Sequence, residues 1–225
     1  MSTIDLNLTT LPLDTKKEII EQLDLRSIAI LGQTDHQFKT LTDSLLLKIV
    51  QKIQSPSTQG SPIQQIKRHV EELYAKADEL KDNRIKSLLD QPKTLKNVSF
   101  LQKFLKARDI LILWNELLPN APKLDQLKTC NDVIENADGF SAAFNQDKEQ
   151  YITNTTYLSL VGESLTHIPL ELFELSNLTH LYLHRNMLTE IPDEIGNLKN
   201  LTSLSLSENA LKTLPSQITT LKVRP

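Results

Sequence analysis

The sequence predicts an α+β protein in which a helical front is followed by a short solenoid of repeats with a parallel, concave sheet. Two observations predict this division. The last third of the 225-residue chain repeats a pattern of leucines at a constant period, whereas residues 1–150 contain no repeat and space their apolar residues as helices do. A third observation, the stretch SPSTQGSP at 55–62, is rich in Ser, Pro and Gly and predicts a linker.

These patterns divide the chain into four parts. We expect a three-helix unit over 1–54, the linker over 55–62, a helical region that caps the repeats over 63–154, and about three 23-residue coils over 155–225. A chain of this length can bury the cores of two small domains.

The first unit begins with a helix-start signal. Thr15 is followed three residues later by Glu18, which is the spacing of a capping box. A second short helix is expected from Ser27, in SIAIL, and a third from Thr34. The apolar side of the third helix consists of Phe38, Leu41, Leu45 and Ile49.

Three helices are expected between the linker and the repeats. The first has an amphipathic spacing of apolar residues, namely Ile66, Val70, Leu73, Ala77 and Leu80. The second is strongly apolar over 100–118 and ends before Pro119, and the third covers 124–137. GFSAAF then predicts a connection into the repeats. Because basic and acidic residues alternate in this region, they predict solvated helix faces and no basic patch.

Equivalent positions in the last part of the chain fall 23 residues apart. They include Leu160, Leu183 and Leu206, and also Pro169, Pro192 and Pro215. This pattern resembles the leucine-rich repeat over about residues 155–222. In LTHLYLHRN, Leu181 and Leu183 are expected to point inward from a short strand. Asn186 and Asn209 follow at turns, where a buried amide can satisfy backbone groups of stacked coils. Glu163 takes this place in the first repeat and predicts an irregular, capping-like coil.

The resemblance implies that the concave side of the sheet binds protein. The outward residues of the strands, which we call the strand face, are Tyr157, Ser159, Val161, His180, Tyr182, His184, Ser203, Ser205 and Ser207. Tyr182 is the best anchor candidate because aromatic residues dominate binding hot spots. In the alternative interpretation, three coils are too few for an independent binding module, and the strand face only caps the helical part.

A metal site is not expected on this face. His180 and His184 lie four residues apart, which on a strand separates them by about 13 Å. Two ligands of one ion must lie much closer than that.

The third coil is expected to leave an apolar edge, because only KVRP follows Leu221 and no amphipathic helix covers it. The edge consists of Leu204, Leu206, Leu211, Leu214 and Ile218. Either the chain is a fragment of a longer array, or the edge pairs with a partner or with a second copy in a homodimer. The sequence does not choose between these alternatives.

The opening part of the chain resembles a second family, the F-box, over about residues 8–50. The matching positions are Leu11, Pro12, Glu18, Ile19, Leu23, Ser27, Ile28, Leu31 and Phe38, the last where the family commonly has Trp. The resemblance implies binding of the Skp adaptor of a cullin ubiquitin ligase. The residues that it implies for this contact are Leu11, Pro12, Ile19, Ile20 and Ile28. The alternative is an ordinary three-helix cap.

Composition and motifs argue against several other functions. With 25 Lys and Arg against 28 Asp and Glu, the net charge of −3 does not predict binding to nucleic acid or to an anionic membrane. The first residues do not form a secretion signal, and no apolar stretch reaches the roughly 18 residues of a membrane span. A single cysteine indicates a reducing, cytoplasmic compartment. Phosphate-binding and metal motifs are absent from the sequence, so no cofactor is expected.

Cys130 offers one route to an enzyme. The triplet Cys130, Asn131 and Asp132 resembles the nucleophile motif of the bacterial leucine-rich-repeat ubiquitin ligases, although that family carries its cysteine after the repeats. On the expected helix, Cys130 shares a face with Leu127 and Ile134, which predicts a small buried side chain.

We therefore expect a non-enzymatic adaptor with two ends. The repeats would hold an unidentified target and the first unit would recruit the ligase, so that ubiquitin transfer is accelerated by proximity. F-box proteins with such repeats also occur as effectors of bacteria that live inside eukaryotic cells, which would place the protein in the host cytosol. The alternative is a leucine-rich-repeat scaffold or signalling protein without a ligase link.

Overall fold

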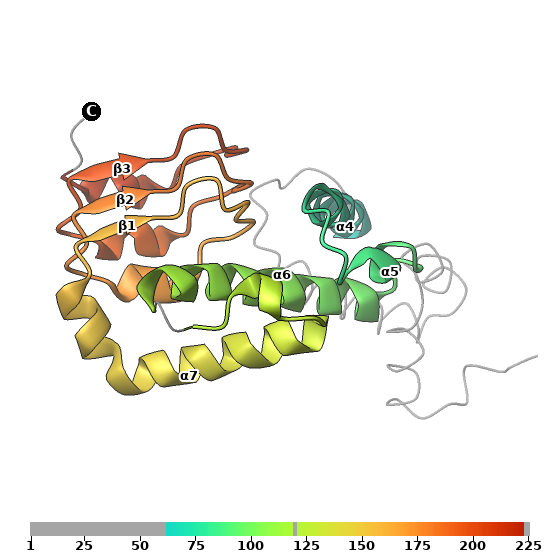
Figure 1. Ribbon diagram of the computed structural model, residues 1–225. Helices are drawn as coiled ribbons and strands as arrows, with labels where there is room; N and C mark the ends of the chain where they lie inside the picture. Colours follow the sequence, from blue (N-terminus) through green and yellow to red (C-terminus); the bar gives the residue numbers. More distant parts are fainter. Residues whose placement is uncertain (1–61, 119–120, 223–225) are drawn as a thin grey trace, which may run out of the picture. The chain divides into compact units, whose positions relative to one another are not determined.

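The computed structural model describes residues 62–118 and 121–222 (Figure 1). The expected three-helix unit, its five adaptor-binding residues and the linker up to residue 61 lie outside the described residues. The described chain divides into two compact units between Gln102 and Lys103.

The first unit contains α4 (Pro62–Glu79), α5 (Lys86–Leu89) and the beginning of α6 (Leu95–Leu117). Pro62 starts α4, where its missing N–H costs nothing. The predicted apolar spacing is confirmed for Ile66, Val70, Leu73 and Ala77, which are buried together with Tyr74. It is wrong for Leu80, which follows the end of α4 and is only half-buried. Burial also raises the pKa of the Tyr74 hydroxyl. The Lys93 ammonium lies 4.8 Å from the centre of the Tyr74 ring.

The second unit begins with the rest of α6 and continues through a 3₁₀ turn (Leu124–Gln126) and α7 (Cys130–Asn154). The single helix predicted over 124–137 is wrong, because the chain breaks at Thr129 to cap α7. The Asp132 N–H donates to Thr129 Oγ1 at 3.1 Å, and the Thr129 N–H donates to an Asp132 carboxylate oxygen at 2.9 Å. The donation from the Thr129 backbone is the main cause that lowers the pKa of Asp132.

GFSAAF is not a connection, because it lies inside α7. Phe140 and Phe144 are four residues apart, so they share one side of the helix. Both rings contact Trp114 of α6, with ring centres 5.9 Å and 5.2 Å away. Tyr151 approaches the same indole at 5.5 Å. The tertiary packing of these rings extends the helix past the point where Gly139 would favour a stop.

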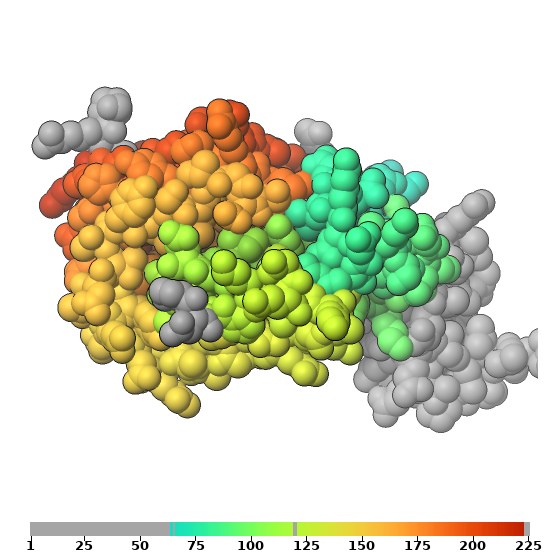
Figure 2. Space-filling model, viewed as in Figure 1, coloured from blue at the N-terminus to red at the C-terminus, as the bar shows by residue number. Residues whose placement is uncertain are grey.

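The repeats form a parallel sheet of three strands in the order β1 (Tyr157–Ser159), β2 (His180–Tyr182) and β3 (Ser203–Ser205). Tyr157 pairs with His180, and His180 pairs with Ser203, so the 23-residue period is the register of the sheet. Each strand is followed by a 3₁₀ helix on the other side of the coil, over Leu170–Glu174, Asp193–Asn197 and Ser216–Thr220. The equivalent prolines immediately precede these 3₁₀ helices. In the space-filling view the coils form adjoining bands that end in red (Figure 2).

One apolar core joins the helices and the repeats of the second unit. Trp114 and Phe144 belong to the same buried cluster as Leu158, Leu181 and Leu183 of the first two coils. The inward direction predicted for Leu181 and Leu183 is confirmed, since both are fully buried. The third coil differs: Leu204 and Leu206 are only half-buried, and Leu214 is 54% exposed.

Candidate interaction surface

Two asparagines hold the strands in register. The Asn186 amide oxygen accepts the Leu165 N–H at 2.9 Å, and its nitrogen donates to the carbonyls of Leu160 and Leu183 at 2.7 and 2.9 Å. Asn209 makes the equivalent bonds one coil later, including those to the Leu188 N–H and the Leu183 carbonyl. The role predicted for both amides at the turns is confirmed, and each side chain ties its own coil to the preceding one.

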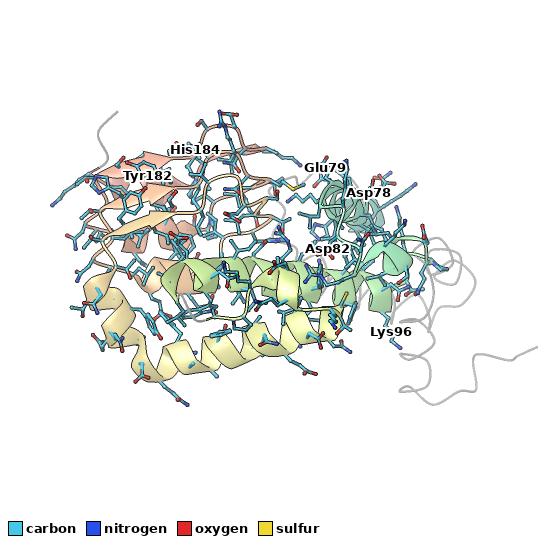
Figure 3. All side chains as sticks on the ribbon, in the orientation of Figure 1. Asp78, Glu79, Asp82, Lys96, Tyr182 and His184 are labelled. Carbon is cyan, nitrogen blue, oxygen red and sulfur yellow. The ribbon has the colours of Figure 1, made fainter. Side chains whose placement is uncertain are left out.

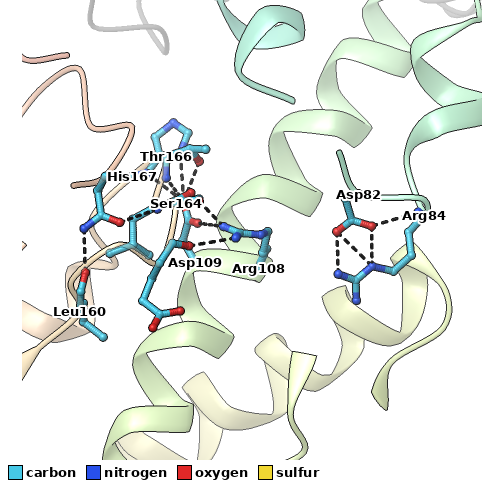
Figure 4. Close-up of polar contacts among 11 residues, drawn as sticks. Asp82, Arg84, Arg108, Asp109, Leu160, Ser164, Thr166 and His167 are labelled. Atoms are coloured by element: carbon cyan, nitrogen blue, oxygen red, sulfur yellow. Dashed lines mark hydrogen bonds and ion pairs between the residues drawn. The ribbon is translucent and has the colours of Figure 1, made fainter. Parts of the chain in front are cut away.

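The first coil has Glu163 at the asparagine position, and Arg108 of α6 bonds to its turn instead. The guanidinium donates to the carbonyl of Glu163 at 3.0 Å and to that of Ser164 at 3.1 Å (Figure 4). It also pairs with Asp109 at 3.0 Å. Ser164 has a left-handed φ of 56°, so the turn is irregular as the sequence predicted.

Asp109 completes this connection. One of its carboxylate oxygens accepts three bonds, from the Thr166 N–H at 3.1 Å, the Thr166 hydroxyl at 2.6 Å and the His167 N–H at 2.8 Å (Figure 4). The carboxylate is buried, with 1% of the residue exposed. Buried charges of this kind are stable only when they are paired and hydrogen-bonded, as here.

Sequence reasoning missed both charged residues, because it assigned the charges of the helical region to solvated faces. That interpretation is wrong for Arg108 and Asp109, which are 8% and 1% exposed. The signal that could have found them is their place directly before the apolar run ILILW, in ARDILILW. A charged pair at that position must find buried polar partners.

The structure places all nine predicted residues on or just after the three strands. Residues 157, 180 and 203 are paired across the sheet, as are residues 159, 182 and 205. Val161, His184 and Ser207 follow at the equivalent position after each strand. Figure 3 shows Tyr182 and His184 on the second coil. The nine side chains therefore form three rows across the coils, one row for each set of equivalent positions.

Four rings of the strand face contact one another. The centres of Tyr157 and Tyr182 lie 5.6 Å apart, and the planes meet at 68°. His180 lies 6.4 Å from both tyrosines, and His184 lies 6.4 Å from Tyr182. Tyr157 is nevertheless 57% exposed. An edge-to-face contact holds this exposed ring in position before any partner binds.

The third coil presents hydroxyl groups in the same positions. Ser203, Ser205 and Ser207 replace the His180, Tyr182 and His184 of the second coil. The Ser203 hydroxyl lies 3.4 Å from the Tyr182 hydroxyl, to which it donates. None of the nine side chains is a carboxylate, a lysine or an arginine. The strand face thus combines one exposed ring, Tyr157, and three half-buried rings with neutral hydrogen-bonding groups.

The described residues do not assemble an evident catalytic or metal site. Thr166, His167 and Asp109 lie together, but the Thr166 hydroxyl is bonded to the carboxylate and the residue is only 2% exposed. It is therefore unsuited to act as a nucleophile. In the described ranges no group of three His, Cys, Asp or Glu side chains could hold a metal ion. None of the helices described there is long and apolar enough to cross a membrane.

Cys130 differs from its predicted setting. It is half-buried and is the first residue of α7, whereas Leu127 precedes the helix, so the two do not share a helical face. The expected face is wrong for Leu127, because Thr129 caps α7 at this point, whereas Ile134 lies four residues after Cys130 in the same helix.

A comparison with known protein families supports the assignment of the repeats. Residues 153–216 match the family model of the leucine-rich repeat. A solved structure of a leucine-rich-repeat protein from Leptospira interrogans is 44% identical over 31% of this chain, with a TM-score of 0.30. The match spans 18% of the length of the Leptospira protein. A search of curated proteins gave no match. The C-terminal part of the chain is thus similar to leucine-rich repeats, which suggests a role in protein–protein interaction.

Proposed function

We propose that the protein is a non-enzymatic interaction module that binds a protein partner on the strand face. The observation that carries this proposal is the ring cluster around Tyr157. A large aromatic side chain that is 57% exposed, yet positioned by Tyr182 at 5.6 Å, is what a binding hot spot requires. The leucine-rich-repeat match over 153–216 agrees with this role.

The rest of the molecule supports a rigid surface. The backbone of β2 is paired on both sides, and Asn186 and Asn209 tie the coils together. Side chains on such a scaffold lose little conformational freedom when a partner binds, so more of the contact energy appears as affinity.

A display library of protein fragments tests the proposal without knowledge of the partner. The full chain is immobilised, and fragments that bind it are selected and then tested against a Tyr157→Ala/Tyr182→Ala variant. We expect selected fragments to bind this variant at least about tenfold more weakly. Leu170→Ala is the matched control, because Leu170 is 58% exposed and lies on a 3₁₀ helix outside the strand face. Fragments that bind all three proteins equally would refute the proposal.

A finer proposal adds a ligase link at the other end of the chain. It is supported only by the F-box resemblance over residues 8–50 and by the order of helical unit, linker and repeats. In this scheme Leu11, Pro12, Ile19, Ile20 and Ile28 contact a Skp-type adaptor while the strand face holds the ligase target. The rival proposal is a scaffold whose first residues have no ligase partner.

Purified Skp adaptor separates these two proposals. The full chain is titrated with the adaptor, next to a Leu11→Ala/Pro12→Ala variant of the same chain. Saturable binding that the variant loses supports a ligase receptor. An unaltered circular dichroism spectrum together with no binding by either protein supports the scaffold, and leaves the role of the strand face unaffected.

A further inference from the structure

A partner that binds on the strand face contacts the side chains of the strands and not the backbone of β2. The backbone groups of β2 are bonded to both neighbouring strands, and the chain after β1 continues the pattern, with the Leu160 N–H donating to the Tyr182 carbonyl at 2.9 Å. A partner that lies across β2 therefore cannot pair with the backbone of that strand. It must instead contact the rings and hydroxyl groups that stand on the sheet.

The charges of the face restrict the partner further. All nine side chains are uncharged when the histidines are neutral. A charged segment would lose part of its hydration on this surface and would gain no opposite charge from these nine side chains in return. An uncharged segment avoids that cost, so the face complements a neutral partner.

The arrangement of the rings indicates the shape of that partner. The rings of Tyr157 and Tyr182 meet at 68° and those of Tyr182 and His184 at 73°, whereas the His180 ring is tilted at 36° and 57° to the two tyrosines. Because these rings already contact one another, a flat, rigid apolar side chain can pack only on their outer surface, above all on the exposed ring of Tyr157. Beside the rings, Ser205 and Ser207 carry small hydroxyl groups that can donate to carbonyl oxygens, whereas the Ser203 hydroxyl donates to Tyr182.

A polyproline II segment meets these requirements better than a helix or a strand does. Its backbone carbonyls make no internal hydrogen bonds and remain available to hydroxyl donors, and its proline rings are rigid before binding. An α-helix satisfies its own backbone and would need an apolar surface, but four of the nine residues here are serines. We propose that the strand face binds an uncharged, proline-rich segment of a partner protein in the polyproline II conformation.

This inference rests on the proposed function and names the chemistry of the partner. Tyr157 and Tyr182 would contact the proline rings, and Ser205 and Ser207 would donate to the carbonyls of the segment. Because Tyr157 is largely exposed, its removal should affect binding more than folding.

Synthetic peptides test the proposal on the full chain. The probe is a peptide of repeated Pro-Pro-Leu units. It is compared with a Gly-Ser-Leu repeat of the same length, which is neutral but flexible, and with a Pro-Pro-Glu repeat, which is extended but charged. Binding is followed by calorimetry and by the NMR signals of isotope-labelled tyrosine rings. We expect the Pro-Pro-Leu peptide to bind at least about tenfold more tightly than either control and to shift tyrosine signals.

The variants show whether this binding uses the strand face. We expect Tyr157→Ala to weaken binding of the Pro-Pro-Leu peptide about tenfold and Leu170→Ala to leave it unchanged. Equal binding of the Pro-Pro-Leu and Gly-Ser-Leu peptides, tighter binding of the Pro-Pro-Glu peptide, or no effect of Tyr157→Ala would overturn the inference. If library fragments still depend on Tyr157 in that case, the proposed function stands and only the polyproline II partner is refuted. If they do not depend on it, both proposals fail.

Discussion

The first and third coils have related sequences but different surroundings. The first coil packs its leucines against Trp114 and Phe144, and its turn is bonded to Arg108 and Asp109. The third coil contributes side chains that are only half-buried, among them Leu206. The repeat pattern therefore encodes the path of each coil, whereas burial of its side chains depends on what packs on either side.

Loss of the Asp109 carboxylate is expected to have the largest effect, because this carboxylate accepts three hydrogen bonds that join α6 to the first coil. In Asp109→Ala, Arg108 loses its buried ion pair, and the N–H groups of Thr166 and His167 lose their acceptor. We expect the free energy of unfolding to fall by about 4 kcal/mol in urea titration. Asp138→Ala is the control, since the ion pair of Asp138 with Lys103 is exposed, and it should change stability by less than about 0.5 kcal/mol. A loss below about 1 kcal/mol in Asp109→Ala would contradict the structural role of the carboxylate.

A matched pair of leucines tests the difference in burial directly. Leu183 and Leu206 occupy the same position of successive coils, but only Leu183 is fully buried. We expect Leu183→Ala to destabilise the protein by about 3 kcal/mol and Leu206→Ala by about 1 kcal/mol, because a half-buried site loses less apolar contact. Chemical unfolding of the full chain measures both losses. Equal losses would show that the third coil is as well covered as the second.

The two asparagines should differ in the same direction. Removing the amide of Asn186 leaves the Leu165 N–H and the Leu160 carbonyl without this partner in the protein interior. The bonds of Asn209 lie in a half-buried setting, where water can replace them. We expect losses of about 2 kcal/mol for Asn186→Ala and about 1 kcal/mol for Asn209→Ala, measured by thermal unfolding. A larger loss for Asn209→Ala would reverse the comparison of coils.

Much of the repeat structure could be predicted because each position recurs. The spacing of Leu160, Leu183 and Leu206 and the two asparagines after the strands was enough to predict strands, inward leucines and turn bonds. The connection between α6 and the first coil could not be predicted in this way. It depends on the contact between Asp109 and Thr166, which are 57 residues apart in the chain, and this contact is not part of the repeated pattern.

The predicted helix boundaries are wrong for two reasons, one local and one tertiary. A helix across 124–137 satisfied the apolar spacing, but the reciprocal bonds of Thr129 and Asp132 start a new helix at Cys130. At the other end, GFSAAF was expected to connect the helix to the repeats, but it lies inside α7, where Phe140 and Phe144 contact Trp114. The outward direction of the strand-face rings was expected from the alternation along the strands. Their contacts with one another depend in addition on the register of the sheet.

The smallest effect is expected at the start of α7, the helix whose Phe144 lies in the same buried cluster as Leu158 of the first coil. Thr129→Ala removes the side-chain acceptor of the Asp132 N–H, so we expect a loss of about 1 kcal/mol at neutral pH. Thr153→Ala, on the same helix, is the control. Its hydroxyl donates only to the Glu149 carbonyl on an exposed surface, so thermal unfolding should be nearly unchanged.

The same cap should make stability depend on pH. Since the hydrogen bond from the Thr129 backbone lowers the pKa of Asp132 in the folded protein, the ionised carboxylate stabilises the fold above the ordinary pKa of an aspartate. This contribution is lost as the pH falls through the lowered pKa of the folded state. Unfolding temperatures of wild type and Asp132→Asn should therefore differ most near neutral pH and converge on acidification. A difference that stays constant over this range would mean that the carboxylate has the same pKa in the folded and unfolded chains, and that the cap acts through hydrogen bonds that an amide can also accept.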